Sequence, residues 1–144
     1  MTWLAFPGPG AEAPRPTLLS APYWEGCARG ELLFQRCTAC GRAAGVASWA
    51  CRWCGREALE WQSSAGRGTL CSWSVVWRPR SADLHVPYAV VIAEMDEGFA
   101  LLSNLGECDT DDLALGVRLK AVFRRLSERV GLPLFVLDGA GGPG

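Results

Sequence analysis

Four cysteines in two matching turns are the residues of this sequence best suited to chemistry. The segments Cys37–Gly41 and Cys51–Gly55 both have the form CxxCG. Two residues between the thiols let one tight turn present both sulfurs to a single metal ion. The glycine after each second cysteine permits a left-handed backbone that aims amide N–H groups at the sulfurs. Since four thiolates satisfy tetrahedral Zn²⁺, we predict a structural zinc site with the ligands Cys37, Cys40, Cys51 and Cys54.

Three other uses of paired cysteines fit the sequence less well. Disulfides are disfavoured by the odd total of seven cysteines and by the expectation of a cytosolic protein. Thioredoxin-like redox chemistry needs a CxxC at a helix start in a βαβ context, which this segment lacks. Iron–sulfur ligation stays open, although paired CxxCG turns favour zinc. Four protein ligands leave no coordination position for a substrate, so the predicted role of the zinc ion is structural. It would stabilise a segment that is too small to form a hydrophobic core of its own.

The other reactive residues do not assemble into a catalytic set. Cys27, Cys71 and Cys108 each sit among apolar residues and are expected to be small buried hydrophobes. His85, the single histidine, is expected in a loop before a strand. The acidic cluster at residues 107–112 lacks the glycine and the terminal glutamate of a calcium loop. With no phosphate loop, nucleophile elbow or HExxH motif in the sequence, we predict no catalytic residue and no enzymatic activity of the chain on its own.

The elements that position these residues are predicted to be mostly strands. A short helix is expected over Ala21–Arg29, because Ser20 is a good N-cap and Gly30 a good stop. Alternating and β-branched residues predict five strands, at 69–77, 88–94, 99–102, 117–126 and 134–137, with a hairpin turn at 95–98. Five strands without a substantial helix indicate a small OB-type barrel. The predicted fold class is mainly β, with the short N-terminal helix and a rubredoxin-like zinc ribbon followed by a five-stranded OB-fold barrel.

Composition and prolines divide the chain. With 144 residues, 49% of them hydrophobic, there is room for one ordinary domain or two very small ones. Four of the nine prolines precede residue 17, so residues 1–19 are predicted to form an extended or disordered arm. Helix and ribbon are assigned to 20–65, the barrel to 66–138 and a disordered tail to 139–144. Docking against a partner or against the body of the protein would explain the apolar residues of the arm, which are Trp3, Leu4 and Phe6.

Several classes of protein are excluded by hydropathy and charge. The longest apolar run, Ala89–Ala93, is too short to cross a bilayer. The first residues lack the basic region of a signal peptide, so a cytoplasmic location is expected. A net charge of −1 argues against a dedicated nucleic-acid binder. Residues 81–117 carry acidic residues and no lysine or arginine, which argues the same way.

The order of these features resembles a known family. It is similar to the zinc-ribbon/OB-fold proteins associated with acyl-CoA enzymes, long catalogued as a domain of unknown function. The resemblance extends from about residue 20 to residue 137. It is carried by an ordered set of short segments: Tyr23–Gly26, Gly30–Cys37, the two CxxCG turns, Glu60-Trp61, Ser64–Leu70, Pro87–Val91, the hairpin before Phe99, Leu115–Val117 and Leu134-Phe135.

This resemblance implies a non-catalytic accessory subunit. Members bind thiolase-superfamily enzymes, including thiolases, a hydroxymethylglutaryl-CoA pathway complex, steroid side-chain hydratases and retro-aldolases, and acyltransferases acting on phenolic polyketides. The ribbon and helix commonly contact the enzyme, and the barrel helps to shape the acyl-CoA or acyl-thioester channel. A thiolase-fold enzyme is therefore the implied partner in a hetero-oligomer, and CoA or acyl-CoA is expected only with that partner present.

Aromatic residues are too numerous for the small ribbon to bury them all. Five are expected there: Tyr23, Trp24, Trp49, Trp53 and Trp61. Exposed aromatics near Arg36, Arg52 and Arg56 predict a protein interface, since tryptophan, tyrosine and arginine dominate binding hot spots.

Two alternative functions stay open. Trp73 and Trp77 lie on the same side of one predicted strand and could stack bases if the barrel bound nucleic acid, although we expect at least one of them in the core. The isolated chain could instead bind CoA or acyl-CoA, with phosphates meeting Arg118, Arg124 and Arg125.

Overall fold

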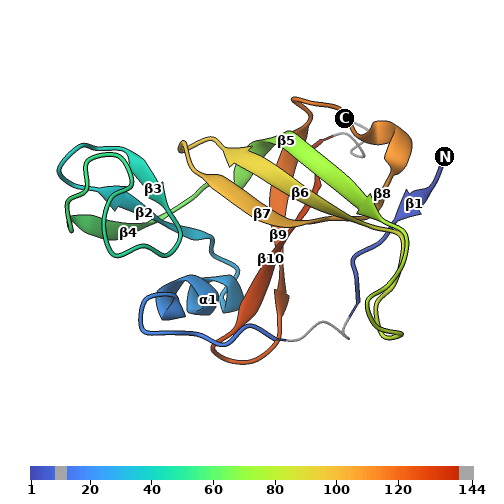
Figure 1. Cartoon of the computed structure of the whole chain (residues 1–144), viewed down its shortest axis with the longest axis horizontal. Helices are drawn as coiled ribbons and strands as arrows, with labels where there is room; N and C mark the ends of the chain where they lie inside the picture. Colours follow the sequence, from blue (N-terminus) through green and yellow to red (C-terminus); the bar gives the residue numbers. More distant parts are fainter. Residues whose placement is uncertain (9–12, 140–144) are drawn as a thin grey trace.

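The computed structural model describes residues 1–8 and 13–139, so arm residues 9–12 and tail residues 140–144 lie outside the described residues. A three-stranded ribbon stands at one side, a closed five-stranded barrel occupies the centre, and one α-helix lies beside both (Figure 1). A two-stranded sheet at the far end of the barrel contains the N-terminus (Figure 1). No helix within the described ranges is long and apolar enough to span a bilayer.

The helix, α1, covers Ala21–Ala28 and forms where it is predicted. Gly30, at φ +79°, ends it in the left-handed conformation that glycine tolerates best. Ser20 does not cap the helix through its side chain, contrary to our expectation. Its hydroxyl instead accepts a hydrogen bond from the backbone N–H of Thr17 at 2.9 Å. The turn that precedes the helix therefore occupies the oxygen that would have capped it.

The ribbon is a small antiparallel sheet with β2 at its centre. Its three strands are β2 (Leu33–Cys37), β3 (Ala43–Gly45) and β4 (Leu59–Ser63). β2 pairs with β4 over its whole length, from Leu33 opposite Ser63 to Cys37 opposite Leu59. The four cysteines lie together at one end of this sheet, where β2 ends at Cys37.

The barrel confirms the predicted mainly β class and its number of strands. Its strands are β5 (Arg67–Val76), β6 (Tyr88–Met95), β7 (Ala100–Leu105), β9 (Arg118–Arg125) and β10 (Gly131–Leu137). They close in the order β10-β7-β6-β5-β9. The predicted hairpin turn joins β6 to β7, and the Met95 N–H donates to the Phe99 carbonyl at 2.8 Å.

The first residues of the chain are docked on the barrel. β1 (Trp3–Leu4) pairs antiparallel with β8 (Cys108–Asp109). The short 3₁₀ helix η1 (Thr110–Asp112) follows, and Asp109 caps it by accepting from the Asp111 N–H at 2.9 Å. Leu4 has no exposed surface and belongs to the main core. Part of the acidic cluster thus has a structural use, as a helix cap.

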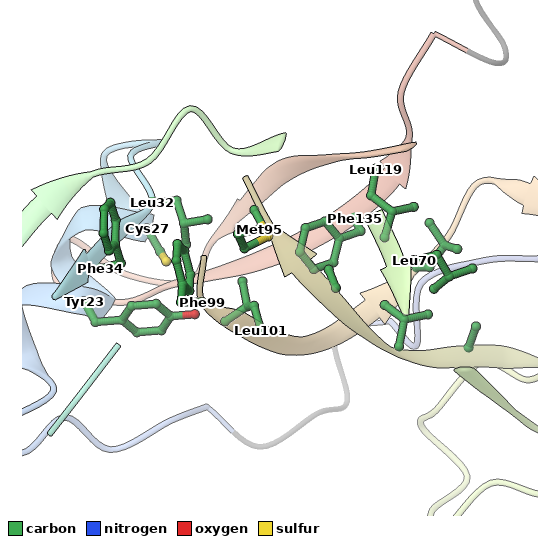
Figure 2. Packing of buried hydrophobic residues seen from close by; sticks show 14 of the residues in the cluster. Tyr23, Cys27, Leu32, Phe34, Leu70, Met95, Phe99, Leu101, Leu119 and Phe135 are labelled. Atoms are coloured by element: carbon green, nitrogen blue, oxygen red, sulfur yellow. The ribbon is translucent and has the colours of Figure 1, made fainter. Parts of the chain in front are cut away.

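The main core runs from the helix and ribbon through the barrel (Figure 2), and a second, smaller cluster in the ribbon contains Cys37, Ala44 and Cys51. At the ribbon end, Phe34 of β2 stacks on Phe99 at the start of β7, with ring centroids 4.9 Å apart and planes 9° apart. Tyr23 and Cys27 of α1 pack beside this pair (Figure 2). Leu70, Leu119 and Phe135 continue the core inside the barrel (Figure 2). The ribbon and barrel are therefore held together by shared apolar contacts.

Two expectations about β5 are wrong. Trp73 is 37% exposed and Trp77 is 59% exposed, so neither is buried in the core. β9 pairs with β5 only through Arg67–Thr69, which leaves the second half of β5 without a neighbour on that side. Trp77 lies beyond the end of the strand. Cys71 is also exposed rather than buried, because it is the extra residue of a β-bulge between Leu70 and Ser72.

Gly131 is the point where β10 passes closest to α1. A Cβ built there would lie 2.4 Å from the carbonyl carbon of Cys27 and 2.5 Å from the backbone nitrogen of Ala28. Both neighbours are backbone atoms, so a side chain can be accommodated only if the helix moves. We expect Gly131→Ala to lower the free energy of unfolding by about 1–3 kcal/mol, as overpacking does. Urea denaturation of the two proteins measures this; equal midpoints would mean that the helix is not held in this position.

Candidate functional site

The two CxxCG turns are built alike. In the first, the Gly41 N–H donates to the Cys37 carbonyl at 2.8 Å, and the Cys37 N–H donates to the Arg42 carbonyl at 2.9 Å. In the second turn, the Gly55 N–H donates to the Cys51 carbonyl at 2.8 Å, and the Cys51 N–H donates to the Arg56 carbonyl at 2.9 Å. Both glycines have φ of +79°, which a side chain would oppose. The glycines thus permit the tight turns that the sequence motif requires.

All four cysteine sulfurs converge on one point. Their Sγ atoms lie within 4.8 Å of one another. The distances from Cys37 to Cys54 and from Cys40 to Cys51 are both 3.6 Å, and each joins one turn to the other. Tetrahedral bonds of about 2.3 Å to one ion place sulfurs roughly 3.8 Å apart. The four thiols therefore fit a single tetrahedral metal ion.

Backbone amides favour the thiolate form of one cysteine in each turn. The Cys40 N–H lies 3.5 Å from the Cys37 sulfur and lowers the pKa of that thiol. Burial raises the pKa of Cys51, but hydrogen bonds from the N–H groups of Cys54 and Trp53, together with those from the Cys40 and Cys37 thiols, bring the pKa down to about 7. Because metal binding requires thiolates, these amides prepare the cluster to bind an ion.

A buried glutamine supports the loop between the two turns. Gln35 of β2 is only 4% exposed. Its side-chain Nε2 donates to the Ser48 carbonyl at 3.2 Å, and its Oε1 accepts from the Ser48 N–H at 2.7 Å. Nothing in the sequence singles out Gln35, because one glutamine in a short strand is indistinguishable from a solvated position.

A basic and aromatic surface lies beside the cysteines. Trp49 is 72% exposed and Trp53 is 49% exposed. The guanidinium carbons of Arg42 and Arg52 lie 5.1 and 5.0 Å from the ring centre of Trp53. The indole N–H of Trp53 donates to the Ala43 carbonyl at 2.9 Å, which fixes the ring. We call Arg42, Trp49, Arg52 and Trp53 the ribbon surface.

The prediction that the ribbon cannot bury all of its aromatic residues holds for two of the five. Tyr23 is buried and Trp24 and Trp61 are half-buried, so the ribbon region covers three of its five aromatics. Arg36 does not join the surface, because its guanidinium donates to Gln62 and to the Gly41 carbonyl, both at 2.9 Å. Arg42 was not predicted to belong to this surface, because its place over Trp53 depends on the fold of the first turn.

The arginines proposed to meet phosphates are engaged within the chain. Arg118 forms a two-bond ion pair with Asp96 at 2.7 and 2.8 Å, which lowers the pKa of that carboxyl. Arg124 donates to the Gly8 carbonyl at 3.1 Å, and Arg125 donates to the Ser127 carbonyl at 3.1 Å. The structure therefore assigns these three side chains to holding strands and the arm.

The remaining candidate nucleophiles are inert or isolated. Burial raises the pKa of Cys27 to about 12. Burial and the neighbouring carboxylates raise the pKa of Cys108 to about 11. Both thiols are buried, as predicted. His85 lies in the loop between β5 and β6, also as predicted, and its backbone N–H donates to the Pro7 carbonyl at 2.9 Å.

Comparisons with known proteins agree with this architecture. The family model of the ChsH2 C-terminal OB-fold domain matches residues 61–124. A DUF35 domain-containing scaffold protein of Methanocaldococcus jannaschii is 30% identical over 99 residues, which are 67% of this chain and 70% of that protein. A probable enoyl-CoA hydratase alpha subunit of Thermomonospora curvata is 28% identical over 88% of this chain, but the match spans only 40% of that subunit.

A solved structure extends the likeness to three dimensions. The structure titled Ltp2-ChsH2(DUF35) aldolase contains a chain that superposes with a TM-score of 0.76 and 26% identity. The superposition covers 86% of this chain and 98% of that one. The likeness thus includes both the ribbon and the barrel.

Proposed function

This chain belongs to the DUF35 family, and from that premise we propose that it is a non-catalytic accessory subunit of an acyl-CoA enzyme of the thiolase superfamily. The observation that carries the proposal is the likeness to the DUF35 chain of the Ltp2-ChsH2 aldolase, which covers nearly all of that chain. A relative named as a scaffold protein and another named as a hydratase alpha subunit support the accessory role. In this proposal the partner holds the catalytic residues, and the barrel helps to line the acyl-CoA channel.

We assign the four-cysteine cluster to structural zinc in this complex. Cys37, Cys40, Cys51 and Cys54 would hold the ion, and no position would be left for a substrate. The chemistry supplied by the ion is the cross-linking of two turns. A rigid ribbon would then present the ribbon surface in a fixed orientation.

We assign a separate role in the complex to each predicted segment of the chain. Helix and ribbon, within 20–65, would make the contact with the enzyme, and the barrel, within 66–138, would line the channel. The first residues of the arm are assigned to covering one end of the barrel, which the pairing of β1 with β8 beside the barrel supports. We expect the complex in the cytoplasm, with CoA or acyl-CoA bound only when both subunits are present.

The ribbon surface is the proposed contact with the partner enzyme. It combines exposed indoles with arginines, the residue types that dominate binding hot spots. We expect Trp53→Ala to weaken the complex by at least about 2 kcal/mol, or roughly thirtyfold in Kd, as removal of a hot-spot residue does. Biolayer interferometry against the purified partner measures this loss.

The matched control for this prediction is Trp77→Ala. Trp77 is also an exposed indole, at 59%, but it follows β5 and lies outside the ribbon. Its replacement is expected to leave Kd within a factor of about two, since surface residues away from an interface contribute little. Equal losses from both variants, or no loss from Trp53→Ala, would remove the ribbon surface from the interface.

A further inference from the structure

An open groove lies on the outside of the barrel. It has a volume of about 380 Å³ and is formed by the arm, α1, the loop after β5 and the strands β6, β7 and β10. Its lining is mainly apolar and includes Pro7, Trp24, Leu84, Tyr88, Leu102 and Leu134. Both its volume and its composition fall within the range of small-molecule sites. We call this hollow the barrel groove.

The lining of the barrel groove includes an apolar side chain that the fold leaves uncovered, that of Leu102. Leu102 of β7 is 66% exposed. It lies directly opposite Ile92 of β6, which is 40% exposed and lies just outside the lining of the groove. Leu102 and Ile92 therefore form an apolar pair on the outer face of the sheet. Covering such a pair with an apolar body is favourable because the contact removes this surface from water.

Tyr23 brings a free hydrogen-bond donor to the groove. The residue lines the groove and is only 5% exposed, yet its hydroxyl has no hydrogen-bond partner among residues 1–8 and 13–139. No fully enclosed side-chain nitrogen or oxygen in those ranges lacks a partner. The Tyr23 oxygen must therefore border space that solvent or a ligand can enter. Burial raises the pKa of Tyr23, so the hydroxyl keeps its proton.

Arg80 supplies a positive charge at the same site. It lines the groove from the loop after β5 and is exposed. Arg67, Arg118 and Arg124 are held by ion pairs or hydrogen bonds. The guanidinium of Arg80 has neither within the described part of the chain. The groove therefore combines an apolar floor with an unengaged cation and an unengaged donor.

We propose that the barrel groove binds a small amphipathic carboxylate. Its apolar body lies on Leu102 and Trp24, its carboxylate meets Arg80, and Tyr23 donates a hydrogen bond to an oxygen of the ligand. The ligand is a free acid bound by this chain alone, so the site is additional to the proposed accessory role. Neither the zinc ion nor the partner enzyme is needed for binding.

The test is a fluorescence titration of the full chain with anilinonaphthalene sulfonate, followed by displacement with dodecanoate or with dodecanol. We expect saturable binding of the probe and stronger displacement by the acid than by the alcohol. Arg80→Gln is expected to weaken dodecanoate about threefold to fivefold and to leave dodecanol unchanged, as loss of an exposed ion pair does. Leu102→Gln is expected to weaken both ligands about tenfold.

Matched variants outside the groove provide the controls. Arg78→Gln and Leu115→Gln replace an exposed arginine and a leucine that is 72% exposed, and neither residue lines the groove. Both are expected to bind like the unaltered chain. Tyr23→Phe keeps the ring in the core and is expected to weaken dodecanoate about twofold to tenfold through the lost hydrogen bond. Circular dichroism of each variant establishes that it is folded.

Three results would overturn the proposal. The first is no saturable binding of the probe. The second is equal loss of affinity from Leu102→Gln and Leu115→Gln, which would place the ligand elsewhere. The third is no binding of dodecanoate together with weaker capture of the partner enzyme by Leu102→Gln, which would make the groove a protein-docking surface.

Discussion

Cys51→Ser is expected to abolish metal binding and to unfold the ribbon. Cys51 is buried, its sulfur lies 3.6 Å from that of Cys40, and its pKa is lowered, so it is well placed as a ligand. Structural zinc sites contribute apparent binding energies of about 10–16 kcal/mol. A ribbon of three short strands cannot replace that contribution with its own core. Atomic absorption of the purified protein should therefore fall from one zinc per chain to none.

The control for this variant is Cys71→Ser. Cys71 is exposed on the β5 bulge and lies outside the four-cysteine cluster. Its replacement is expected to leave one zinc per chain and an unchanged fold. Chelation of the unaltered chain should reproduce the effect of Cys51→Ser, with lost near-ultraviolet dichroism from the ribbon tryptophans. Iron in place of zinc, or a ribbon that stays folded without metal, would contradict the assignment.

Leu4→Ala is expected to destabilise the whole barrel, although the residue lies in the arm. Leu4 has no exposed surface and belongs to the main core. The Glu107 N–H donates to the Leu4 carbonyl at 2.7 Å, which fixes the segment beside β8. Removal of a buried leucine side chain leaves a cavity and costs about 2–5 kcal/mol. The free energy of unfolding from urea denaturation should fall by that amount.

Trp3→Ala serves as the matched control because Trp3 is the neighbouring residue of β1. It carries a larger side chain than Leu4 but is 58% exposed. Its replacement should cost less than about 1 kcal/mol, as surface substitutions do. If Leu4→Ala and Trp3→Ala have the same small effect, the first residues of the arm do not contribute to the stability of the barrel.

Local patterns made part of this fold predictable. The CxxCG turns depend on residues within five positions of each other, and the structure forms the same turn twice. The barrel strands alternate apolar and polar residues over short windows, so their number could be predicted. The helix stop at Gly30 likewise depends on one residue and its φ of +79°.

Long-range contacts explain what the sequence did not reveal. Leu4 of β1 is paired with Cys108 of β8, and nothing near either residue predicts this pairing. The exposure of Trp73 follows from the short pairing of β9 with β5, which is a property of the closed barrel. Arg118 is a typical phosphate-binding residue by type, yet Asp96 on a neighbouring turn holds it. In each case the partner is distant in sequence.

Purification of the tagged chain from its native cells, followed by native mass spectrometry, tests the accessory role most directly. We expect a complex of defined stoichiometry with a thiolase-superfamily enzyme, and the chemistry of that enzyme would identify the reaction. The same purification with Trp53→Ala should recover less of the enzyme, whereas Trp77→Ala should recover as much as the unaltered chain. Recovery of the chain alone, or with ribonucleoprotein in place of an acyl-CoA enzyme, would contradict the account.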